Sequence, residues 1–142
     1  MFFLPNLIRL ENIYQKSKMI SNEDYVKKIL QQVLDSYRII HNLSDKRGDL
    51  DVIKKELLKI NGFFSVILKK FSESNFQLRS LLDLQPKIKN FVQSYYFVQE
   101  IDTMIPLYSE DSSRIKNMRL KILEAFQDKK LIDKLQEVLE EL

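Results

Sequence analysis

Apolar residues recur every three or four positions along most of this chain, which is the spacing of one face of an α-helix. In the clearest stretch, Ser21 and Asp24 form an acidic variant of the capping box that begins helices. Such stripes predict helices over residues 6–18, 21–42, 50–71, 76–84, 86–105 and 112–126, and a terminal segment over 128–142. The pattern therefore predicts an all-α fold, a single-domain helical bundle of five to six helices that covers residues 1–142.

The predicted helix over 86–105 has a wider apolar stripe than the others. Tyr95, Tyr96 and Phe97 follow one another in it, and a helix that is apolar on several sides is expected at the centre of a bundle. Pro86 is expected in its first turn, where the missing N–H costs nothing. Segments of turn-forming residues are expected to separate the helices over 43–49, 72–75 and 106–113.

Composition supports the helical prediction. The 142 residues include only two Gly and three Pro, whereas an all-β fold needs more of both at its turns. Gly62 lies within the predicted helix over 50–71, and a close helix crossing would explain its lack of a side chain. The absence of cysteine excludes disulfides and thiolate metal sites.

The sequence also bears on location. The longest uncharged runs have about half of the ~20 residues that a membrane span needs. The apolar N-terminus is not preceded by a basic segment, so a secretion signal is not expected. The predicted location is the cytoplasm, or the interior of the host cell for a viral protein.

Candidate catalytic residues are scarce. His41 is the only histidine, and it lies at the predicted end of a helix, where an imidazolium interacts with terminal carbonyl groups. One histidine without cysteine does not provide the usual ligands of zinc or haem, and two glycines cannot build a phosphate-binding loop. Arg47-Gly48-Asp49 spells an integrin-binding tripeptide but is expected to form a turn. The sequence therefore predicts a non-enzymatic protein with no cofactor, no metal site and no evident small-molecule substrate.

Positive charge is concentrated in two stretches. Residues 46–89 contain ten Lys or Arg against five Asp or Glu, and residues 112–130 contain six against two, although the chain carries only +3. Basic side chains on one face would bind the phosphates of RNA or DNA, with an affinity that falls with salt. The candidate nucleic-acid-binding residues are Lys54, Lys55, Lys59, Lys69, Lys70, Arg114, Lys116, Arg119 and Lys121. The alternative is a solvated surface on which lysine favours solubility.

Apolar side chains near both ends are candidates for contact with another protein. Residues 1–4 precede Pro5 and either fold back over the bundle or enter a groove of a partner. The segment over 128–142 either packs within the chain or pairs with a partner helix. The candidate partner-binding residues are Phe2, Phe3, Leu4, Tyr96, Leu135, Leu139 and Leu142.

Two functions from different classes fit these features. The first hypothesis is a protein-interaction or assembly module, a helical bundle that dimerises with a second copy or docks onto a larger protein. The alternative is a small nucleic-acid-binding subunit, which requires the nine basic residues to converge on one surface. No segment carries a motif specific enough to name a family.

Overall fold

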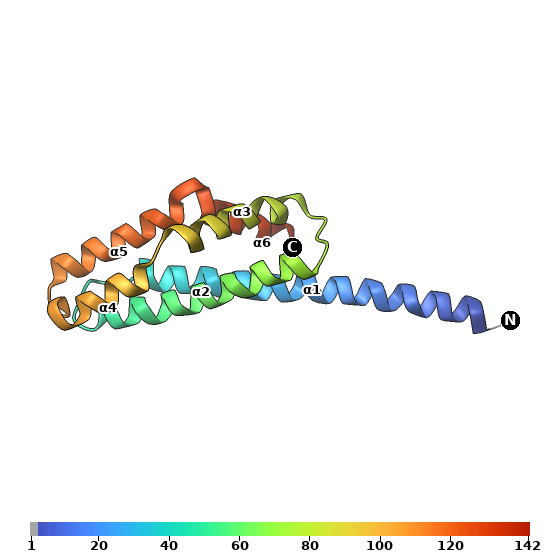
Figure 1. Ribbon diagram of the computed structural model, residues 1–142, viewed down its shortest axis with the longest axis horizontal. Coiled ribbons are helices and arrows are strands. Elements are labelled where there is room, and N and C mark those ends of the chain that lie inside the picture. The colour runs from blue at the N-terminus through green and yellow to red at the C-terminus, as the bar shows by residue number, and fades with distance from the viewer. Residues whose placement is uncertain (1–2) are drawn as a thin grey trace.

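Six α-helices and one 3₁₀ turn make up most of residues 3–142, the part of the chain whose backbone the computed structural model describes (Figure 1). They are α1 (Phe3–His41), α2 (Asp49–Glu73), α3 (Arg79–Ser94), α4 (Phe97–Tyr108), α5 (Ser112–Gln127), η1 (Asp128–Lys130) and α6 (Leu131–Glu141). Side chains are described from Asn22 onward. No strand occurs within residues 3–142, so the predicted all-α bundle is confirmed. No helix in this range combines the length and apolar character that a bilayer crossing requires.

The two longest helices, α1 and α2, form an antiparallel hairpin that the other helices cover. The turn between them spans residues 42–48, within one residue of the predicted 43–49. At the other end of the hairpin, Asn22 Nδ2 donates to Ser74 Oγ at 3.4 Å, and Lys70 Nζ lies 5.2 Å from the centroid of the Tyr25 ring. Helix α2 therefore ends beside Asn22, and the N-terminal part of α1 continues beyond it (Figure 1).

Aromatic rings from four helices meet in the core. Phe126 of α5 is fully buried, stacks on Phe91 of α3 with 4.4 Å between ring centroids, and meets Tyr37 of α1 at 5.4 Å. Phe64 of α2 meets Phe91 edge-on at 5.6 Å. Full burial of a side chain of this size contributes about 1.5–3 kcal/mol of hydrophobic free energy. This cluster therefore joins α1, α2, α3 and α5.

The predicted break before Ser21 is absent, because the segments 6–18 and 21–42 belong to the single helix α1. Ser21 and Asp24 have the residue types of a capping box, but such residues favour a helix start without stopping a helix that arrives from the N-terminal side. No Gly or Pro occurs in residues 6–47, so the sequence contains no strong helix breaker there.

The helix predicted over 86–105 is two helices, because the chain leaves the helical conformation at Tyr95 (φ −128°, ψ 132°) and Tyr96 (φ −124°, ψ 47°). Helix α3 passes through Pro86 instead of starting there. The proline lacks the N–H that would bond to the Leu82 carbonyl, but both residues are exposed, so water can satisfy that carbonyl. The predicted central helix is therefore wrong, and its wide apolar stripe is divided between α3 and α4.

Two neighbouring boundaries also differ from the prediction. The short helix expected over 76–84 begins at Arg79 and continues into α3 without a break. Helix α4 extends through Pro106 to Tyr108, into the segment expected to be a loop. Both helices continue through their prolines, so the position of proline in the sequence does not mark the helix ends.

Gly48 and Gly62 have different backbone requirements. Gly48 precedes α2 with φ 90°, a conformation that residues with a side chain rarely adopt. Gly62 lies inside α2, and a Cβ atom placed on it would have no neighbour within 4 Å. The predicted close helix crossing at Gly62 is therefore wrong, because nothing approaches the space that a side chain would fill.

Two consecutive lysines reverse the chain between α5 and α6. Lys129 (φ 53°) and Lys130 (φ 57°) both adopt the left-handed conformation, which costs about 1–2 kcal/mol for a residue other than glycine. The reversal lays α6 against α3, with Leu135 and Val138 fully buried. Of the two alternatives predicted for the C-terminal segment, packing within the chain is the one observed.

The break after α3 places the Tyr95 hydroxyl beside the end of α5, where it donates to Asp128 Oδ2 at 3.1 Å. Burial raises the pKa of Tyr95 above 10.0, and the hydrogen bond to Asp128 and the negative charges of Asp128 and Glu124 raise it further. The pKa of Tyr95 is higher in the folded chain than in the unfolded chain, so the protonated hydroxyl stabilises the folded state. This stabilisation is complete below pH 10.0. The stabilisation from Tyr95 is lost as the pH rises through the pKa that Tyr95 has in the folded chain.

Replacement of Tyr95 by phenylalanine is expected to lower the free energy of unfolding by less than about 1 kcal/mol at neutral pH, since the hydrogen bond is solvent-exposed. The gap between the two proteins is expected to narrow above about pH 10, because ionisation of Tyr95 then favours the unfolded wild-type chain. Urea unfolding followed by circular dichroism at about pH 8 and about pH 10.5 measures both effects. If the difference in unfolding free energy between the two proteins is constant or larger at the higher pH, the pKa of Tyr95 is not raised by folding.

Candidate functional site

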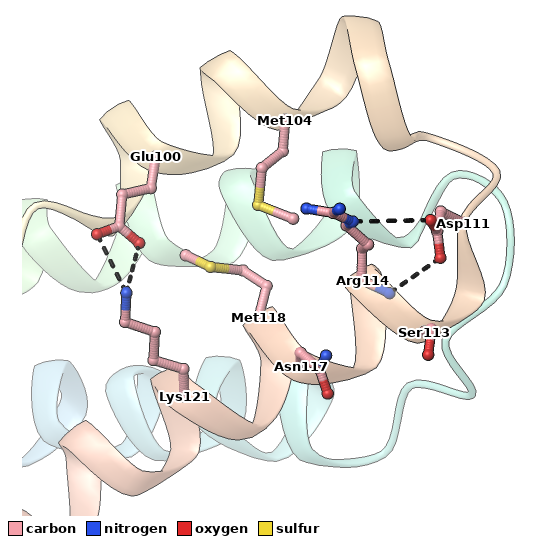
Figure 2. A pocket seen from close by; sticks show the side chains of 8 residues that line it. All are labelled: Glu100, Met104, Asp111, Ser113, Arg114, Asn117, Met118 and Lys121. Carbon is pink, nitrogen blue, oxygen red and sulfur yellow. Dashed lines mark hydrogen bonds and ion pairs between the residues drawn. The ribbon is translucent and has the colours of Figure 1, made fainter.

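A groove of about 500 Å³ opens between α4 and α5 (Figure 2). Met104 of α4 and Met118 of α5 point toward each other in its middle. Met118 is buried and Met104 is half-buried, so the two thioethers form the apolar centre of the groove. The remaining lining residues are polar: Glu100, Asp111, Ser113, Arg114, Asn117 and Lys121.

An ion pair lies on each side of the two methionines. Lys121 Nζ contacts both carboxylate oxygens of Glu100 across the groove, at 3.0 and 3.3 Å. Asp111 caps α5 by accepting from the Arg114 backbone N–H at 3.1 Å, and its other oxygen lies 3.8 Å from the Arg114 Nε. The Arg114 guanidinium also lies 4.1 Å from the Tyr108 ring centroid. The four charged side chains are 42–58% exposed, so each pair contributes at most about 1 kcal/mol and an incoming ligand can displace it.

The groove exists because α4 packs more closely against α2 than against α5. Only Phe97 and Ile101 of α4 are buried, although most of its residues are apolar. The loop that joins α4 to α5 contacts the turn after α1 through the exposed ion pair of Arg47 with Glu110, at 3.2 Å. Leu107, near this end of α4, is 71% exposed.

The chemistry of the lining suits binding. Methionine is flexible and polarizable, so it adapts to apolar groups of different shape. The charged residues at the two ends can offer hydrogen bonds to a polar flank of a ligand. The lining includes no histidine, and Ser113 is hydrogen-bonded to no base among the described side chains. Within residues 22–142, no group of three or more acidic or histidine side chains is placed to hold a metal ion.

Arg119, one of the predicted nucleic-acid ligands, binds the turn between α1 and α2. Its Nε and Nη2 donate to the two carboxylate oxygens of Asp45 at 2.7 and 3.1 Å, and its Nη1 donates to the His41 carbonyl at 3.1 Å. The Arg119 and Asp45 side chains are only 13% and 10% exposed. The hydrogen bond to Asp45 raises the pKa of Arg119. This guanidinium is therefore engaged in holding the fold.

The other predicted basic ligands are spread along two helices, and most are already paired. Their ion pairs are Lys54–Asp102, Lys59–Glu56, Lys69–Glu73, Arg114–Asp111 and Lys121–Glu100. Lys70 lies over Tyr25, while Lys55 and Lys116 are exposed. Lys54 and Lys69 are 15 residues apart, which is about 22 Å along α2. The structure does not bring the nine residues together on one compact surface.

The predicted partner-binding residues have different environments. Tyr96, between α3 and α4, is 63% exposed. Leu135 is fully buried and does not reach the surface, whereas Leu139 and Leu142 are half-buried against the core. The candidates that lie outside the residues with described side chains are Phe2, Phe3 and Leu4.

Two motifs singled out in the sequence have local structural roles. The Asp49 side chain of the Arg-Gly-Asp tripeptide is buried, and its Oδ2 accepts from the Lys46 backbone N–H at 3.0 Å. That carboxylate therefore closes the turn and is not presented to a receptor. His41 ends α1 as predicted, and its Nδ1 lies 3.2 Å from Asn42 Oδ1.

Sequence reasoning missed the groove. Met104 and Met118 lie on the apolar stripes of the segments predicted as helices over 86–105 and 112–126, and the structure buries Met118 but leaves Met104 half-buried. Helical periodicity identifies the inward face of a helix but does not indicate where two neighbouring helices diverge. The chain thus belongs to the class of all-α bundles and carries a methionine-centred groove on its surface. It matches no family model, no curated protein and no solved structure.

Proposed function

We propose that this protein is a helical protein-interaction module whose α4–α5 groove binds a short amphipathic helix of another protein. The observation that carries the proposal is the pair of methionines that face each other across an open groove (Figure 2). Leu107, three residues after Met104 on α4, is 71% exposed. Flexible methionine side chains in a groove are typical of surfaces that accommodate a partner helix.

The dimensions of the groove suit one or two turns of a helix. Arg114 and Lys121, which belong to the two flanking ion pairs, are seven residues apart on α5, or about 10 Å along its axis. Two apolar side chains spaced three or four residues apart on a partner helix fit within that length. The exposed ion pairs then lie at the polar rim, where they favour one orientation of the partner.

A different protein is a better occupant than a second copy. Besides Leu107, the large apolar side chains that are exposed within residues 22–142 are scattered along the chain: Tyr25, Ile39, Leu58, Leu82, Tyr96 and Leu120. These residues form no described apolar stripe that would fill the groove. An isologous dimer needs the same patch to complement itself, and two methionine grooves facing each other leave the space between them open.

Nucleic-acid binding has weaker support. That alternative depends on a convergent basic surface, and six of the nine predicted residues are in ion pairs within the chain. A nucleic acid would have to compete with those carboxylates for the basic side chains. Each ion pair that it breaks leaves a carboxylate without its cation, which offsets the gain from counterion release.

A photo-crosslinking amino acid placed at Ser113, in the lining and exposed, is expected to capture a partner protein in cells. The same amino acid at Ser65, exposed on α2, serves as the control and is not expected to capture that protein. The captured protein is then produced separately, and its affinity for the full chain is measured by calorimetry. Substitution of Met104 by lysine is expected to weaken binding at least tenfold, as a charge in an apolar contact does.

Two further variants keep this test decisive. Asn117→Trp fills the groove from an exposed position without altering the core and is expected to weaken binding as well. Leu58→Lys introduces the same charge at an exposed apolar residue of α2 and is expected to leave binding unchanged. Equal affinities for Met104→Lys, Asn117→Trp and Leu58→Lys contradict the groove as the docking site. A concentration-dependent dimer that Asn117→Trp abolishes would instead make a second copy the occupant.

A further inference from the structure

A second hollow, also about 500 Å³, lies where α3, η1 and α6 meet. Three of its six lining residues are lysines, and each comes from a different element: Lys87 from α3, Lys129 from η1 and Lys134 from α6. The other lining residues are Asp83, Pro86 and Asn90 of α3. The proposed groove between α4 and α5 shares none of these residues, so the two features are independent.

The three ammonium groups are held in place by contacts within the chain. Lys87 Nζ donates to the Lys129 backbone carbonyl, and Lys129 Nζ donates to Asn90 Oδ1 at 3.1 Å. Lys134 Nζ lies 2.8 Å from Glu137 Oε2. An ammonium group has three N–H donors, and each of these contacts uses one of them. Two donors on each lysine thus remain for a ligand.

The backbone that carries Lys129 into the hollow is strained. Lys129 and Lys130 both adopt the left-handed conformation, for which glycine or asparagine would be the stable choice. The strained turn aims the Lys129 carbonyl at Lys87 and brings the Lys129 side chain to Asn90. Strain retained in a folded protein is concentrated at places that bind or react.

The charges in the hollow favour a compact anion. Its three lysines outnumber its single carboxylate, Asp83, which is itself paired with Arg79 at 3.3 Å. Glu137 and Glu141 also act on Lys134, so the excess positive charge is centred on Lys87 and Lys129. The volume is within the range of small-molecule sites and leaves room beyond one phosphate group. We propose that this lysine hollow binds the phosphate group of a small phosphorylated molecule through Lys87, Lys129 and Lys134.

The test is a titration of the ¹⁵N-labelled full chain with inorganic phosphate and with adenosine 5′-monophosphate, each compared with chloride at equal ionic strength. Both phosphate probes are expected to give saturable shifts of the backbone amides of residues 87–90 and 128–134, with the nucleotide binding more tightly. In the variant Lys87→Gln/Lys134→Gln the affinity is expected to fall at least tenfold. The matched variant Lys55→Gln/Lys116→Gln loses the same charge at two exposed lysines outside the lining and is expected to bind normally.

Lys129→Asn separates binding from folding. Asparagine tolerates the left-handed conformation, so this variant is expected to be at least as stable as the wild type. It is also expected to bind phosphate more weakly, because the ammonium group is gone. Shifts that do not saturate, or an equal loss in both double variants, overturn the proposal. Binding of a single-stranded oligonucleotide that exceeds nucleotide binding and weakens equally in both double variants also overturns it, because it points to an extended basic surface.

Discussion

Substitution of Arg119 by methionine is expected to lower the free energy of unfolding by about 3 kcal/mol, because it leaves the Asp45 carboxylate buried without its partner. The Asp45 side chain is 10% exposed, and both of its oxygens accept from Arg119. The same substitution also removes the donor to the His41 carbonyl at the end of α1. Urea unfolding followed by far-ultraviolet circular dichroism measures the change, and the chain has no tryptophan for fluorescence.

A surface pair and a double variant provide the controls. Lys69→Met breaks an ion pair with Glu73 whose lysine is 75% exposed, and it is expected to change stability by less than about 1 kcal/mol. Arg119→Met/Asp45→Asn is expected to recover part of the loss, because no buried charge remains unpaired. If Arg119→Met costs no more than Lys69→Met, the buried pair does not hold the turn between α1 and α2.

Substitution of Phe126 by alanine is expected to lower the free energy of unfolding by about 4 kcal/mol, since it empties a fully buried site. The ring stacks on Phe91 and meets Tyr37 edge-on, so its loss loosens contacts between α5 and two other helices. Thermal and urea unfolding of the two proteins measure the difference. Phe126 is therefore expected to be among the most sensitive positions of the chain.

Two leucine variants provide a milder test in case Phe126→Ala does not fold. Phe126→Leu keeps most of the volume and is expected to cost about 1–2 kcal/mol. Phe63→Leu makes the same change at a half-buried ring of α2 and is expected to cost less than that. Equal losses for the two leucine variants contradict the central place of Phe126 in the core.

Helices whose limits are marked by nearby residues were predicted correctly, and features that depend on distant residues were not. The helices α2 and α5 were predicted within a few residues, because their apolar stripes lie between clear turn segments. The break at Tyr95 and Tyr96 was missed, since both residues suit a helix or an extended segment and apolar spacing does not indicate the contacts that the break allows. Tyr95 gains a hydrogen bond to Asp128, 33 residues away, and a stacked contact with Phe97 at 5.2 Å.

The candidate sites were less predictable than the helices. The basic residues were assigned from their density along the chain, but the partner of Arg119 is 74 residues away and the partner of Lys121 is 21 residues away. A count of charges along the chain does not indicate which carboxylate pairs with each basic side chain in the folded protein. The lysine hollow was missed for the same reason, because Lys87 and Lys129 are 42 residues apart in sequence.

The sequence by itself determined that this protein is an all-α bundle, because apolar periodicity and the scarcity of Gly and Pro act locally along the chain. It also determined which face of most helices is buried, as Ile53, Leu57 and Ile60 of α2 illustrate. Only the tertiary structure decided where helices diverge and which distant charges meet. Those features depend on how side chains from separate helices pack against one another and which of them remain in contact with water. A local sequence pattern does not contain that information.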